Sequence, residues 1–166
     1  MADISGQLRV HLSPGLEQAP AMDLLCTQFV LTLTGRHGSR FNWRRDVNAL
    51  MALAGRHLVW PEHVLLKLRG FLALRCRDNG FWTGHEQLSP SEFLERHGVW
   101  RGAYEEGSLF YYLDEFVKDS AKDMLTLLAT TGDWVQQRLR KSPVEMQKNI
   151  DSLGTLLQLN PAERAL

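Results

Sequence analysis

Apolar residues recur every three or four positions along most of this chain, which is the spacing of amphipathic helices. The pattern predicts helices over residues 21–34, 43–54, 61–76, 90–96, 108–129 and 143–158. Short connections separate these segments, so neighbouring helices are expected to pack against one another. We therefore expect a mainly α-helical fold, a compact bundle of about six helices.

Helix starts are marked by a recurring combination of residues. Ser89-Pro90-Ser91-Glu92 and Ser142-Pro143-Val144-Glu145 each place a capping Ser before a Pro and a Glu. The Ser caps free N–H groups, the Pro needs no hydrogen bond at the first helical position, and the Glu reaches back to the cap. Both segments are predicted to begin helices.

The longest apolar stripe lies within residues 108–129 and is expected to face the core. Its members are Phe110, Leu113, Val117, Ala121, Met124 and Leu128, of which Leu113, Val117, Met124 and Leu128 are predicted to be buried. The sequence Thr130-Thr131-Gly132 is expected to interrupt the helix, with a shorter one following from Asp133.

Two regions favour extended structure or loops. Residues 1–20 contain Pro14, Gly15 and Pro20 and are expected to form a loosely ordered N-terminal arm, with a short strand at 7–12. Asp78-Asn79-Gly80 is a turn sequence, so a small β-hairpin near 71–85 competes with a helix followed by a loop. We favour the helix.

The last seven residues repeat the helix-start pattern without a helix behind it. Asn160-Pro161-Ala162-Glu163 is followed by only three residues. A helix this short gains too little to form alone. We therefore expect a helical domain over 21–159, and we expect 160–166 to begin a truncated helix that leads to a missing C-terminal region.

The overall charge is zero, with 19 basic and 19 acidic residues, but the charges are segregated. Residues 36–77 hold nine Lys or Arg and two acids, whereas residues 78–133 hold eleven acids and four Lys or Arg. Pairing between the two blocks inside the molecule, or a protein partner, is the favoured interpretation. The alternative is a nucleic-acid-binding surface on 36–77, whose affinity would fall steeply with salt.

A weak helix-turn-helix pattern over 91–113 makes that alternative a winged-helix-like domain, with 78–85 as the wing. However, Glu105 and Glu106 in the proposed recognition segment would repel phosphates. Two helices meeting at a Gly turn is the favoured interpretation of this pattern.

Aromatic residues beside Arg are the best candidates for partner contacts, because both residue types are favoured at interface anchors and on stacking surfaces. The predicted partner-binding residues are Arg40, Trp43, Arg44, Arg45, Arg69 and Trp82.

No catalytic residue, metal site or cofactor is predicted in this stretch. The six His do not pair with another His or Cys at metal-ligand spacing, the two Cys form no motif, and neither a nucleophile elbow nor a phosphate-binding loop is present. The sequence holds no apolar run long enough to cross a bilayer and no signal peptide. We therefore expect a cytoplasmic protein without a membrane partner.

Residues 149–166 resemble a sequence pattern found in the helical N-terminal region of certain bacterial AAA-family ATPases, ahead of the ATPase core. The shared positions are Asn149, Ile150, Leu153, Leu156, Leu157, Leu159, Glu163, Arg164 and Leu166. The resemblance implies a non-catalytic recognition or regulatory domain that binds a protein partner or substrate. It also implies a missing ATP-driven motor, through which the whole protein would oligomerise and act as an ATPase.

Because 160–166 begins a helix without completing it, we expect the reading frame to continue past the codon for Leu166. It should encode a Gly-x-x-x-x-Gly-Lys-Ser/Thr motif, whose backbone amides cradle phosphates. Sequencing the gene downstream of this codon is the measurement. A stop codon directly after Leu166 would contradict the expectation.

Overall fold

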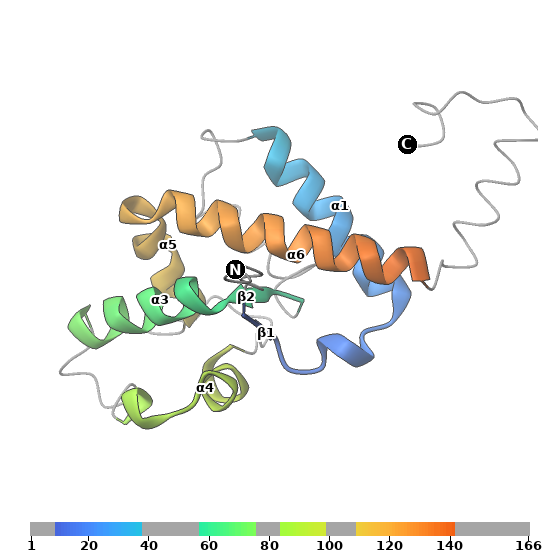
Figure 1. Ribbon diagram of the computed structural model, residues 1–166. Helices are drawn as coiled ribbons and strands as arrows, with labels where there is room; N and C mark the ends of the chain where they lie inside the picture. Colours follow the sequence, from blue (N-terminus) through green and yellow to red (C-terminus); the bar gives the residue numbers. More distant parts are fainter. Residues whose placement is uncertain (1–8, 38–56, 76–83, 99–108, 142–166) are drawn as a thin grey trace, which may run out of the picture.

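The computed structural model describes residues 9–37, 57–75, 84–98 and 109–141. Within these ranges lie five helices and two short strands (Figure 1). The helices are α1 (Ala21–His37), α3 (Glu62–Arg75), α4 (Pro90–His97), α5 (Leu109–Asp119) and α6 (Ala121–Lys141). The strands are β1 (Val10–Leu12) and β2 (Val59–Pro61). The predicted fold class, mainly α with a small β element, is confirmed.

Helix α6 is the central element of the fold. It packs against α1, β2, α5 and α3, and Figure 1 shows it lying between α1 on one side and the small sheet with α3 on the other. Its buried residues are Met124, Leu127, Thr131 and Val135. These positions are three or four apart, so they form one inward stripe.

The small sheet joins two distant parts of the sequence. β1 and β2 are antiparallel, with Val10 opposite Pro61 and Leu12 opposite Val59. Just beyond β1, Leu16 is only 1% exposed. The short strand expected at 7–12 is confirmed for Val10–Leu12. Residues 10–18, which were expected to belong to a loosely ordered arm, are instead part of the packed domain.

The hairpin considered near 71–85 can be compared with the structure only at its two ends, because residues 76–83 lie outside the described part of the chain. Residues 71–75 belong to α3, as the favoured interpretation had it, and His85–Gln87 form a 3-10 turn. The buried residues of α3 are Val64, Leu65, Leu68 and Leu72, which recur at helical spacing. Burial of this stripe explains why the helix is preferred over the hairpin.

The predicted helix 108–129 is wrong in its extent. The helix is interrupted at Ser120, because α5 ends at Asp119 and α6 begins at Ala121. In the first turn of α6 the Met124 amide donates to the Ser120 carbonyl at 3.1 Å. α6 then continues through Thr131 and Gly132, where an interruption was expected. The Thr131 hydroxyl is buried and donates to the Leu127 carbonyl at 2.8 Å, so a polar residue is accommodated inside the helix.

The capping prediction for α4 is confirmed. The Glu92 amide donates to the Ser89 hydroxyl at 3.3 Å, and the Ser89 amide donates to the Glu92 carboxylate at 2.8 Å. The hydrogen bonds with Ser89 hold the pKa of Glu92 below its usual value. α1 also forms as predicted but extends to His37, so Gly35 lies inside the helix.

The main core is apolar and includes residues from α3, α4, α5 and α6. Leu113 and Met124 are buried in it as expected, and Val117 packs against it. Leu128 differs, because it lies between α1 and α6 in a groove. The predicted helices 43–54 and 143–158 and the end segment 160–166 lie outside the described residues.

Shortening a core side chain should test this arrangement. Leu113 is 0% exposed, so Leu113→Ala should lower the free energy of unfolding by about 2–5 kcal/mol through lost burial and a residual cavity. Leu74 on α3 is 77% exposed, so Leu74→Ala is the matched control and should change stability by less than about 0.5 kcal/mol. Chemical denaturation measures both. Equal effects of the two changes would contradict the assigned core.

Candidate functional site

Of the six predicted partner-binding residues, Arg69 alone lies within the described part of the chain. Arg40, Trp43, Arg44, Arg45 and Trp82 lie outside it. The grouping of the six residues therefore stays a prediction.

Arg69 lies on α3 and binds the segment that precedes α4. Its guanidinium donates to the carbonyls of His85 at 2.9 Å, Glu86 at 3.2 Å and Leu88 at 2.6 Å. It also lies 5.3 Å from the centre of the Phe93 ring. These contacts occupy the guanidinium inside the molecule, so Arg69 has a structural role here.

Two other described cations of the basic segment 36–77 are also paired internally. Lys67 forms an ion pair with Asp123. Arg75 forms one with Glu115 at 2.8 Å between Nε and Oε2. Like Arg69, both contact residues of the acidic segment 78–133. These exposed pairs contribute little stability individually, but they show the charge blocks meeting within the fold.

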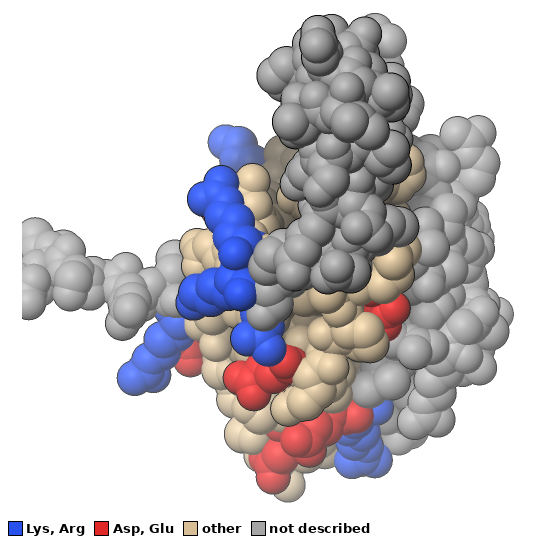
Figure 2. Space-filling view, turned by 90° about the vertical axis from the view of Figure 1, so that its right-hand side faces the viewer, with Lys and Arg blue, Asp and Glu red and all other residues tan. Residues whose placement is uncertain are grey.

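A different group of cations is exposed at the end of α6. Figure 2 looks onto this end, and Lys and Arg side chains gather where the last turn of the helix faces the viewer. That turn contains Arg138, Arg140 and Lys141. Arg138 donates to the Glu17 carbonyl at 3.2 Å. Positive charge complements the negative end of the helix dipole, which is a sufficient reason for these residues.

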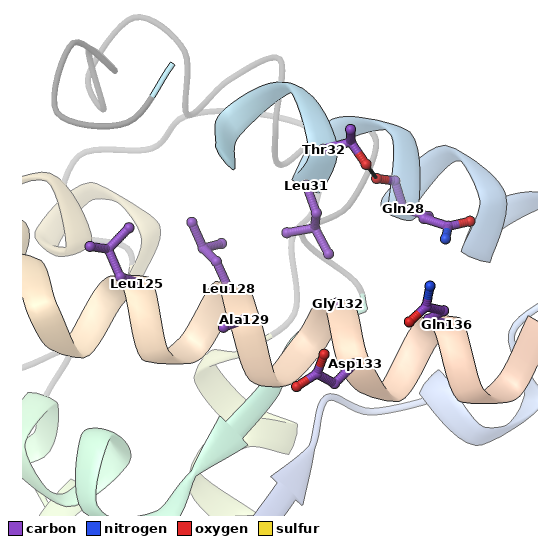
Figure 3. Close-up of a pocket in the computed structure, with 9 residues that line it drawn as sticks. All are labelled: Gln28, Leu31, Thr32, Leu125, Leu128, Ala129, Gly132, Asp133 and Gln136. Carbon is purple, nitrogen blue, oxygen red and sulfur yellow. Dashed lines mark hydrogen bonds between the residues drawn. The ribbon is translucent and has the colours of Figure 1, made fainter. Parts of the chain in front are cut away.

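The candidate binding site is a groove between α1 and α6 with a volume of about 480 Å³ (Figure 3). α1 forms one wall and α6 the other. The lining residues from α1 are Gln28, Leu31 and Thr32. Those from α6 are Leu125, Leu128, Ala129, Gly132, Asp133 and Gln136. None of these positions was among the predicted site residues.

The groove changes character along its length. Leu125 and Leu128 stand at one end, and Leu31 points from α1 toward α6 beside them (Figure 3). Gln28 and Gln136 face each other at the other end. One end therefore offers apolar contact, and the other offers amide groups for hydrogen bonds.

Small residues give the groove its depth. Ala129 and Gly132 lie on the α6 wall. A Cβ atom placed on Gly132 would have Leu31 Cδ1 as its nearest neighbour, at 3.9 Å. The space beneath Leu31 therefore exists because glycine at position 132 has no side chain.

Exposed apolar side chains lie on the same two helices. Leu125 is 59% exposed at the groove, and Phe29 and Met22 on α1 are 63% and 43% exposed. α1 also buries Leu24 and Val30 on its inner side, so it is apolar on both faces. A helix that is apolar all round is normally covered on both sides.

One feature of the sequence indicates this groove, although the spacing of the apolar residues alone did not identify it. The apolar residues of α1 do not form one narrow stripe, which indicates a second apolar contact. Leu128 was instead assigned to the core, because its spacing fits the stripe of α6. Which of these residues face a groove depends on how α1 lies across α6, and that is a long-range contact.

The turn before α4 and α4 itself carry two buried histidines. His85 and His97 flank Phe93, with ring centres 6.3 Å and 5.2 Å away. Burial, then the positive charge of Arg96 and the proximity of His85, lower the pKa of His97 to about 4. His97 is therefore neutral near pH 7. No cluster of three His, Cys, Asp or Glu suited to a metal occurs in the parts of the chain that the structure describes.

Comparisons with known proteins give no assignment. No protein-family model matches the chain, and no curated protein or solved structure matches it either. Among the described helices, none combines the length and apolar character that crossing a membrane requires.

Acid should destabilise the domain through His97. The unfolded chain takes up a proton on this residue near pH 6.5, whereas the folded chain does so only near pH 4. The free energy of unfolding should therefore fall as the pH is lowered from 6.5 to 4. His97→Gln should make this fall shallower, and Gln87→Ala, at an exposed position before α4, should leave it unchanged. Thermal melts across this range measure both, and equal slopes for His97→Gln and the parent would refute the role of His97.

Proposed function

We propose that this chain is a non-catalytic recognition domain that binds a protein partner through the α1–α6 groove. The observation that carries the proposal is the groove itself, with its apolar end, its amide-lined end and the exposed Leu125. Grooves between helices are common docking sites for protein segments.

The chemistry of the lining residues supports binding. Asp133 is the one ionisable side chain among the nine that line the groove. The Thr32 hydroxyl donates to the Gln28 carbonyl at 2.8 Å, so it is engaged within its own helix. General acid–base or nucleophilic catalysis needs paired reactive groups, whereas these residues offer surface and hydrogen bonds.

Charge favours a protein over a nucleic acid as the occupant. The groove is lined by one carboxylate and by no Lys or Arg. A nucleic acid would require cations to neutralise its phosphates. The nucleic-acid alternative therefore depends on Arg40, Arg44 and Arg45, which lie outside the described residues.

The setting of the domain follows from the resemblance at its C-terminal end. Residues 149–166 are similar to a segment of AAA-family ATPases that precedes the motor. We propose that the domain is the N-terminal part of such an ATPase and selects its protein partner or substrate. The motor would supply ATP hydrolysis, and this domain would supply recognition.

Site-specific crosslinking in cells tests the recognition role. A photoactivatable amino acid replacing Ala129, inside the groove, should yield a discrete protein adduct, whereas the same group replacing the exposed Gln87 beside α4 should not. Leu125→Asp should reduce the adduct from position 129 at least tenfold, because a charge at the apolar end opposes docking.

Leu74→Asp provides the matched control for Leu125→Asp. Both leucines are exposed, but Leu74 lies on α3, away from the groove. The adduct should survive Leu74→Asp. Equal loss in both variants, or equal adducts from positions 129 and 87, would contradict a role for the groove.

A further inference from the structure

We propose that the partner presents an amphipathic helix of about three turns, with a Lys or Arg placed against Asp133. This inference rests on the proposed function and specifies its occupant. The length of the groove, the backbone chemistry of its walls and the charge of its lining each point to this kind of segment.

The length follows from the spacing of the residues on α6. Leu125 and Gln136 mark the two ends of the α6 wall. Eleven residues of helix rise by about 16 Å, which corresponds to about three turns of a docked helix. Such a helix presents apolar residues at i, i+3 or i+4, and i+7, in line with the groove.

The walls favour a helix over an extended strand. Both walls are helices, whose backbone groups are already hydrogen-bonded within α1 and α6. The lining residues offer few side-chain partners, chiefly Gln28, Asp133 and Gln136. An extended peptide would leave much of its backbone without partners against the leucines, whereas a helix satisfies its own backbone.

The charge of the residues that line the groove indicates which charged residue the partner presents. Asp133 is exposed, and its neighbours one turn away along α6 are Ala129 and Gln137, so α6 itself supplies no cation there. A Lys or Arg of the partner beside Asp133 would gain attraction and orient the helix. The apolar residues of the partner would then lie against Leu31, Leu125 and Leu128.

Two synthetic peptides test this specificity against the full chain. Both are amphipathic sixteen-residue helices with one leucine stripe, carrying either Lys or Glu at both ends of the stripe so that either orientation is sampled. Fluorescence anisotropy should show the Lys peptide binding at least fivefold more tightly than the Glu peptide. Asp133→Lys should reverse this preference, because the Lys peptide would then meet a like charge and the Glu peptide an opposite charge.

Matched variants separate the groove from general charge effects. Glu95→Lys makes the same charge change on the exposed side of α4 and should leave the peptide preference unchanged. Leu125→Asp should weaken both peptides at least tenfold. Absence of binding by both peptides, a preference that survives Asp133→Lys, or equal effects of Asp133→Lys and Glu95→Lys would overturn the proposal.

Other occupants give different results. If Leu153→Asp in the full chain raised peptide affinity tenfold, a segment of the chain itself would be the occupant, and the proposal would fall. A dimer that dissociates with Leu125→Asp would assign the groove to a second copy and would also overturn it. A protein adduct from position 129 without peptide binding would leave the recognition role standing and reject only the charged helix.

Discussion

The hydrogen bond between the Val59 amide and the Thr131 hydroxyl is the contact on which the arrangement of the domain depends. Val59 and Thr131 are both 0% exposed, and the distance is 3.0 Å. A buried amide without an acceptor would cost free energy comparable to a lost hydrogen bond. Thr131 supplies the acceptor from the middle of α6 while donating to Leu127 in its own helix. The sheet is therefore held at one position along α6.

Further buried polar contacts extend this connection to the rest of the fold. Thr27 on α1 is hydrogen-bonded to His57, just before β2, at 2.9 Å. The Trp60 indole donates to the Ser13 hydroxyl at 3.2 Å, which ties β2 to the turn after β1. Each partner lies at least 30 residues away in the sequence. Apolar burial drives these elements together, and the polar contacts fix where they meet.

Helix starts and buried helix faces could be predicted from the sequence where residues close together along the chain determine them. The start of α4 needed only Ser89, Pro90 and Glu92, and the buried faces of α3 and α5 followed from spacing. The break at Ser120 was not readable in this way, because the residues before and after it share one apolar stripe. The place at which β2 meets α6 was not predictable either, because it involves a hydrogen bond from the Val59 amide to Thr131, 72 residues away in the sequence.

The candidate site was less predictable than the fold. Arg69 was expected to contact a partner, but it is engaged by carbonyls from the turn before α4, and only the folded chain brings these together. The groove combines residues nearly one hundred positions apart in the sequence, from Gln28 to Leu125. Periodicity identified apolar positions on both helices, yet it did not distinguish those that face the core from those that border a groove.

Gly132 gives the groove a property that bears on how the domain could diverge during evolution. Its absent side chain leaves space beneath Leu31, and a methyl group there would meet its nearest neighbour only at ordinary contact distance. Replacement by alanine, and then by larger residues, would make the groove shallower in steps of about one methyl group. The inward stripe of α6 lies on another face of the helix. Because glycine in a helix interior is less stable than alanine by roughly 0.5–1 kcal/mol, such a change would narrow the partner site while making α6 slightly more stable.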